Sequence, residues 1–150
     1  MTPPGLDLLA DADVIVVGAG PAGATAAAYL ADAGIDVLLL DKATFPRDKV
    51  CGDGLTPRAV RELDLLGVPR DSTWLRGRGL RVFGGGHRLE LPWPDGGTYP
   101  NDSLTTPRAE FDAALIARAR EAGARVVEGA AVTGPLLSPA GRVIGVEVRL

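Results

Sequence analysis

One stretch near the N-terminus, Asp13–Asp41, constrains the fold more than any other part of the chain. It reads DVIVVGAGPAGATAAAYLADAGIDVLLLD. The β-branched run Val14–Val17 predicts a strand buried on both faces, as parallel strands are. An alanine-rich helix is expected over Ala22–Ala33, and a second apolar run, Val37–Leu40, ends on an aspartate. Strand, glycine-rich turn, helix, strand and acidic residue together predict a mononucleotide-binding βαβ unit.

The turn contains Gly18-Ala-Gly20-Pro-Ala-Gly23, which has the spacing G-x-G-x-x-G. Gly18 permits the tight turn, Gly20 lets the backbone approach a diphosphate without a Cβ in the way, and Gly23 lets helix and strand pack closely. Pro21 and Ala22, at the start of the expected helix, are included among the cofactor-binding residues, because free amides and a partial positive charge there face the phosphates. The spacing alone is weak evidence, and an ordinary βαβ unit is the alternative, but every element expected around the motif is present.

The acidic residue that ends the second strand predicts a ribose site. Asp41 lies 18 residues after Gly23. Its carboxylate could accept hydrogen bonds from both ribose hydroxyls of an adenosine, and we include the adjacent Lys42 among the cofactor-binding residues. A 2′-phosphate would be repelled there, so NADP is disfavoured in this turn. The motif does not choose between NAD and FAD.

Composition is that of a globular protein and excludes several kinds of partner. Hydrophobic residues make up 46% of the 150 residues and charged residues 23%, which is ordinary globular usage. The net charge of −3 and the 5% aromatic content argue against a nucleic-acid surface. A single cysteine, Cys51, excludes an internal disulfide or a cysteine-based metal site. We expect a cytoplasmic protein, because the N-terminus lacks a signal-peptide pattern and no segment reaches the roughly 20 apolar residues of a membrane span.

Two further helices are expected beyond this unit. Thr56 is predicted to cap the first, which ends near Leu66 and has Leu65 among its buried apolar residues. Thr106 is predicted to cap the second, over residues 108–122. Both caps are followed by proline, which is favoured at the first helical position.

The remaining segments predict antiparallel strands and turns. Residues 68–78 are expected to be a loop, and the expected strands are residues 80–83, 88–91, 125–128, 131–137 and 143–150. The fold class is therefore α/β, a Rossmann-like domain with a parallel sheet plus an antiparallel β excursion. Because the chain stops on Leu150 inside an expected strand, we expect residues 1–150 to be the N-terminal portion of a longer protein.

The segment after the βαβ unit resembles a known family. Residues 45–58 read FPRDKVCGDGLTPR, residues 108–112 read RAEFD, and a Gly-Ala pair leads into a later strand. Together with the leading unit, these residues resemble the geranylgeranyl reductase family, flavoproteins of the p-hydroxybenzoate hydroxylase-like class. The resemblance covers nearly the whole chain and implies FAD as the cofactor.

The resemblance also implies roles for individual residues. The FAD pyrophosphate would lie over the glycine turn, with the adenosine ribose on Asp41. The turn formed by Cys51 and Gly52 would run beside the isoalloxazine ring, and Cys51 is the candidate catalytic residue. Arg108 would contact the ribityl-pyrophosphate region, and the backbone of Val132 would bracket the adenine. The later Gly-Asp segment that binds the ribityl phosphate in the family is absent from these residues.

The activity implied by the resemblance is the reduction of carbon–carbon double bonds in an isoprenoid. Family members act on geranylgeranyl lipids, chlorophyll precursors or the menaquinone side chain, and NAD(P)H or another donor reduces the flavin. The expected partner is an isoprenoid or other apolar small molecule, with peripheral membrane contact expected from a polyprenyl substrate. Two alternatives stay open: a FAD-dependent monooxygenase or halogenase on the same scaffold, and a non-enzymatic prenyl-lipid escort protein. The intact glycine turn argues against the escort protein.

Overall fold

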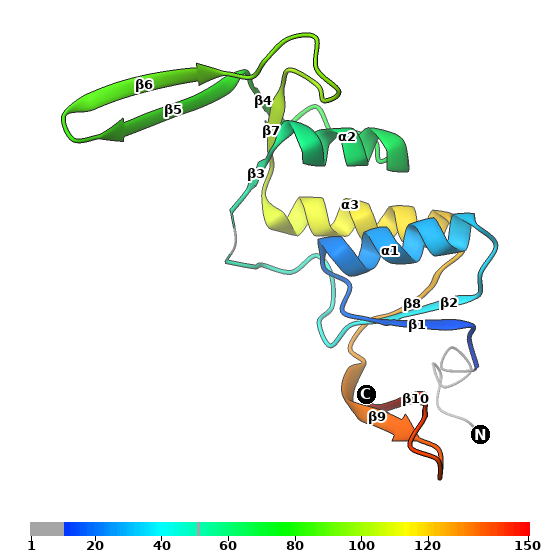
Figure 1. Ribbon diagram of the computed structural model, residues 1–150. Coiled ribbons are helices and arrows are strands. Elements are labelled where there is room, and N and C mark those ends of the chain that lie inside the picture. Colours follow the sequence, from blue (N-terminus) through cyan, green and yellow to red (C-terminus); the bar gives the residue numbers. More distant parts are fainter. Residues whose placement is uncertain (1–10, 51) are drawn as a thin grey trace.

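The computed structural model describes residues 11–50 and 52–150, and it contains a parallel sheet flanked by helices (Figure 1). The sheet consists of β1 (Val14–Val17), β2 (Val37–Leu40) and β8 (Arg125–Val127), in the order β1-β2-β8. Helix α1 (Pro21–Asp32) connects β1 to β2, and it lies beside α3 (Arg108–Glu121) on one face of the sheet. Helix α2 (Pro57–Leu66) lies beyond them. The α/β class and the parallel sheet predicted from the sequence are confirmed.

Antiparallel strands make up the rest of the described chain. A three-stranded sheet is formed by β3 (Gly54–Leu55), β7 (Ser103–Thr105) and β4 (Leu75–Gly77). The predicted hairpin consists of β5 (Gly79–Gly84) and β6 (His87–Pro92), and it projects from the body (Figure 1). The last two strands are β9 (Ala131–Leu137) and β10 (Val143–Arg149), which pair with each other.

Strand β2 separates two hydrophobic clusters because successive side chains of a strand point to opposite faces. Val37 and Leu39 pack with the helices in the larger cluster. Leu38 and Leu40 pack with residues of β8, β9 and β10 in the smaller one. All four side chains are buried, so β2 has the burial on both faces that is typical of a central parallel strand.

Alanine-rich α1 approaches its neighbours closely. Its buried side chains are all alanines, Ala24, Ala27, Ala28 and Ala31. Small side chains bring the axis of α1 near both α3 and the sheet, which fixes where the first turn of the helix lies. Gly34 follows α1 with φ +82°, the left-handed conformation in which many helices end.

Several local predictions were wrong or held only in part. The expected burial of β1 holds in part: Val16 packs against the larger cluster and Ile15 against the smaller one, but Val17 is 55% exposed. Leu65 is 61% exposed, since α2 directs Val60, Leu63 and Leu66 to the core instead. Residues 68–78 are not all loop, because β4 pairs with β7.

The two predicted helix caps had opposite outcomes. Thr56 does cap α2, since its Oγ1 accepts a hydrogen bond from the Ala59 amide at 3.5 Å. Thr106 does not cap α3: it is buried and lies one position before the N-cap residue, Pro107, which makes no side-chain cap. Across the described residues, no helix combines the length and apolar character needed to span a bilayer.

Candidate functional site

The parallel pairing of β1 with β2 brings the glycine turn and the end of β2 together. Val17 pairs with Leu40, so the residues that follow each strand lie at the same edge of the sheet. The Gly18 amide donates a hydrogen bond to the Leu40 carbonyl at 2.7 Å. Gly18 has φ +96°, a conformation that residues with a Cβ rarely adopt. The predicted tight turn therefore exists at this edge.

The second and third glycines of the motif differ in what surrounds them. A Cβ at Gly23 would lie 1.8 Å from the Gly18 carbonyl oxygen, so close packing of α1 on the turn requires glycine there. A Cβ at Gly20 would have nothing nearer than Arg47 Nη2, at 3.8 Å. Gly20 has an ordinary extended conformation, with φ −71°. Packing within the described chain therefore leaves the space above Gly20 open, as a bound diphosphate would need.

The start of α1 is suited to an anion. Gly20 is the N-cap residue without a side-chain cap, and Pro21 occupies the first helical turn. The amides of Ala22 and Gly23 precede the first intrahelical bond, which Ala24 makes to Gly20 at 3.0 Å. No acidic side chain lies in this turn, so the positive end of the helix dipole is not neutralised from within the helix.

Asp41 is held in place by backbone amides on both sides. Its Oδ2 accepts a hydrogen bond from Ala19 at 2.7 Å, and its Oδ1 accepts one from Ala43 at 2.8 Å. The side chain is fixed and the residue is 8% exposed. Each carboxylate oxygen has a further lone pair, so the two oxygens could still accept hydrogen bonds from sugar hydroxyls. Lys42, which follows, is exposed.

Arg108 lies at the start of α3 and is paired with a residue of its own helix. Its Nε and Nη2 each donate to the Asp112 carboxylate at 2.9 Å. Arg47, from the loop after β2, reaches the same carboxylate at 3.5 Å. Asp112 was not among the residues that the sequence predicted for the site. The i, i+4 spacing of Arg108 and Asp112 was the pattern that could have revealed the pair.

Of the other predicted residues, the structure describes Val132 and Gly52. Val132 is in β9 and packs beside Leu38 and Leu40 in the smaller cluster, on the side of the sheet opposite the helices. Gly52 is exposed. Cys51 lies outside the described residues, so its predicted catalytic role stays a prediction.

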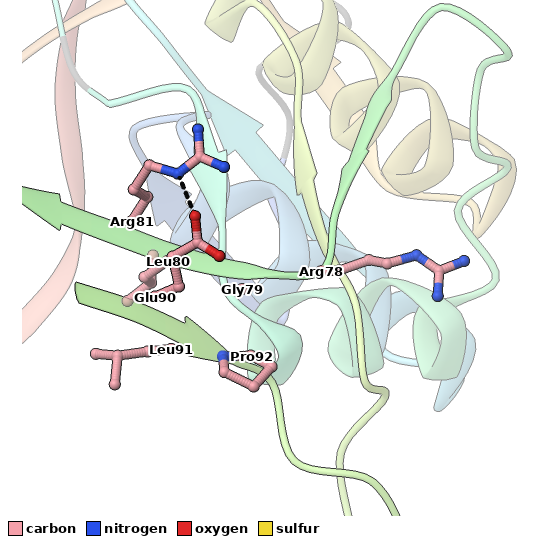
Figure 2. A pocket seen from close by; sticks show the side chains of 7 residues that line it. All are labelled: Arg78, Gly79, Leu80, Arg81, Glu90, Leu91 and Pro92. Atoms are coloured by element: carbon pink, nitrogen blue, oxygen red, sulfur yellow. Dashed lines mark hydrogen bonds and ion pairs between the residues drawn. The ribbon is translucent and has the colours of Figure 1, made fainter. Parts of the chain in front are cut away.

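A separate hollow lies on the β5–β6 hairpin (Figure 2). It is lined by Arg78, Gly79, Leu80, Arg81, Glu90, Leu91 and Pro92. Arg81 and Glu90 form an ion pair across the two strands at 3.0 Å. None of the residues expected to bind a cofactor lines this hollow. Among residues 11–50 and 52–150, no group of three His, Cys, Asp or Glu residues could hold a metal ion.

Comparison with known proteins shows the family. A model of the FAD binding domain matches residues 11–137, and the chain belongs to that family. It is 49% identical over 136 residues to the menaquinone reductase of Mycolicibacterium smegmatis, covering 88% of this chain and 32% of that protein. It is 39% identical over 139 residues to digeranylgeranylglycerophospholipid reductase 1 of Methanopyrus kandleri, covering 90% of this chain and 34% of that protein. The resemblance to geranylgeranyl reductases predicted from the sequence is confirmed.

Among solved structures, the chain is similar to the FAD-dependent halogenase CndH, the myxobacterial chondrochloren halogenase. The TM-score is 0.83 at 28% identity, over 92% of this chain and 33% of the halogenase. The described fold is therefore shared with a FAD-dependent halogenase. The chain spans about a third of the length of the curated relatives that it matches.

Proposed function

We propose that residues 1–150 form the Rossmann-like, FAD-binding part of an enzyme that reduces carbon–carbon double bonds of an isoprenoid. The observation that supports it most directly is the contrast between two glycines. Packing demands glycine at Gly23 but not at Gly20, where the open space lies against the N-terminus of α1. A glycine that the fold does not need is explained by a ligand that approaches the backbone there.

The residues present fit FAD. In this proposal the amides of Ala22 and Gly23 bind its diphosphate, with Pro21 setting the start of the helix. Asp41 and Lys42 bind the adenosine ribose, and Val132 contacts the adenine. Bound FAD would supply the hydride chemistry, and this part of the chain would hold and orient the cofactor.

The substrate and donor belong to the proposal as well. The two relatives named above are a menaquinone reductase and a digeranylgeranylglycerophospholipid reductase, so we propose a polyprenyl chain as substrate. NAD(P)H is the proposed electron donor. A cytoplasmic protein that contacts the membrane surface would meet such a substrate. Cys51 and Gly52 are proposed to lie beside the isoalloxazine ring, with Cys51 contributing to the reaction.

A halogenase or monooxygenase is the second candidate, because the described fold matches the halogenase CndH with a TM-score of 0.83. The two candidates differ in their need for oxygen. The enzyme containing this domain, purified and reconstituted with FAD, should saturate a menaquinone or geranylgeranyl substrate without oxygen when supplied with an electron donor. Loss of turnover under anaerobic conditions, with oxygenated or halogenated product formed in air, would favour the second candidate. Absence of flavin absorbance after reconstitution would overturn both.

A further inference from the structure

Among the described residues, Asp112 is the most deeply buried of the charged ones. Its side chain is 0% exposed. A buried carboxylate without cationic partners is strongly unfavourable. Here it is held by the bidentate pair with Arg108 at 2.9 Å and by Arg47 Nη2 at 3.5 Å. The carboxylate therefore joins the loop after β2 to the first turn of α3.

The Arg47 side chain is fixed beside the glycine turn. Its guanidinium carbon lies 5.0 Å from the centroid of the Phe45 ring, with which it makes a cation–π contact. The amide of Phe45 in turn donates to Glu128 Oε2 at 2.8 Å. The terminal nitrogen Nη2 is the atom nearest to the position of a Cβ on Gly20, at 3.8 Å. Arg47 thus borders the open space above Gly20.

Two guanidinium groups, those of Arg108 and Arg47, contact the single carboxylate of Asp112. Arginine presents several N–H donors in a rigid fork, so two arginines retain donors after binding one carboxylate. An anion at the glycine turn would meet amides from α1 and guanidinium groups from this cluster.

We propose that Asp112 is a positioning residue that holds Arg47, which borders Gly20, together with Arg108, so that both guanidinium groups bind the diphosphate of the cofactor. The inference rests on the proposed function, since it presumes that a diphosphate binds at the turn. Asp112 itself does not contact the ligand. It acts by fixing the arginines before the ligand arrives, which lowers the ordering cost of binding.

The effect of removing the Asp112 charge distinguishes positioning from simple electrostatics. Asp112→Asn raises the local positive charge by one. If charge alone mattered, a diphosphate would bind more tightly to this variant. If Asp112 positions the arginines, binding becomes weaker although the site is more positive. A purely structural role would lower the unfolding temperature without changing the affinity of the folded protein.

The test compares FAD, ADP and adenosine binding in the full protein carrying wild-type sequence, Asp112→Asn, Arg47→Gln or Arg47→Lys. We expect Asp112→Asn and Arg47→Gln to weaken FAD and ADP binding at least about tenfold, the size of one lost charge-assisted hydrogen bond. Adenosine, which lacks phosphates, should bind all four proteins equally. Arg47→Lys should recover part of the loss, and the wild-type affinity should fall more steeply with salt than that of Arg47→Gln. The Arg47 variants leave the buried carboxylate intact, so even if Asp112→Asn does not fold they test whether Arg47 binds the diphosphate, which the proposal requires.

The outcomes separate this inference from the proposed function. Unchanged or tighter FAD and ADP binding in Arg47→Gln and in folded Asp112→Asn would overturn the positioning role while leaving FAD binding at the turn intact. Equal losses for adenosine and ADP would also overturn it, because the effect would not involve phosphate. If the wild-type protein binds neither FAD nor ADP, the proposed function fails and this inference fails with it.

Discussion

The amide of Ala19, inside the glycine turn, donates a hydrogen bond to Oδ2 of Asp41 at 2.7 Å. This bond joins the turn after β1 to the end of β2, and the Gly18–Leu40 backbone bond at 2.7 Å lies beside it. The two parts of the candidate site, one expected to hold phosphates and the other a ribose, are therefore mechanically coupled. A substitution in one part should therefore also alter ligand binding by the other.

Replacing Asp41 should weaken both the fold and ligand binding. In Asp41→Asn the amide NH2 group must face a donor, either Ala19 or Ala43, so one backbone amide loses its partner. We expect a loss of about 1–3 kcal/mol in the free energy of unfolding and weaker FAD binding. Denaturant titration and FAD titration measure the two effects. Asp11→Asn, at an exposed position, is the control and should change neither.

Substitutions at Gly23 and Gly20 should have different consequences. A Cβ in Gly23→Ala would meet the Gly18 carbonyl oxygen at 1.8 Å, so the backbone must move, at a cost of about 1–3 kcal/mol or more. Gly20→Ala finds open space and should leave the unfolding temperature nearly unchanged while weakening FAD binding. Thermal unfolding without ligand and FAD titration give the comparison. Equal stability losses in both variants would contradict the structure.

Glu128 should hold in place the loop that carries Arg47. Its Oε2 accepts from the Phe45 amide at 2.8 Å, and its Oε1 pairs with Arg120 at 2.6 Å. Glu128→Ala should lower the free energy of unfolding by about 2 kcal/mol. It should also speed hydrogen exchange at the Phe45 amide. Glu128→Gln keeps an acceptor for that amide and should retain most of its protection. Equal exchange rates in the two variants would show that Phe45 is held by something else.

The turn at Asp71 predicts a small dependence of stability on pH. Hydrogen bonds from the backbone amide and then the hydroxyl of Thr73 lower the pKa of Asp71 from its ordinary 3.8. Because the folded-state pKa lies below the unfolded one, this contribution is present above about pH 4 and is lost as the pH falls through the folded-state pKa. Thr73→Val removes the hydroxyl bond and should raise the Asp71 pKa. An NMR titration of the Asp71 carboxyl measures it, and an unchanged pKa would refute this assignment.

Local patterns predicted much of the fold because they act over short distances. The βαβ unit, the Thr56 cap and the hairpin of β5 and β6 each follow from neighbouring residues. The errors at Val17 and Leu65 depend on which elements lie next to them in space. Val17 is 55% exposed although Leu40, its partner in β2, is buried, a difference that no local pattern reveals.

The residues of the candidate site also divide into those that local spacing could select and those that it could not. The glycines and Asp41 could be selected from spacing, since each has a fixed place in the motif. The cluster around Asp112 could not, because Arg47 and Asp112 lie 65 positions apart and meet only when α3 packs beside α1. Only the i, i+4 pair of Arg108 and Asp112 was visible in the sequence.

Binding of the diphosphate by the first turn of α1 can be tested most directly by NMR. FAD added to isotopically labelled protein should shift the amide resonances of Gly20, Ala22 and Gly23 and slow their hydrogen exchange, with smaller changes in the β5–β6 hairpin. If these three amides keep their positions and exchange rates at saturating FAD, the cofactor does not bind at the glycine turn.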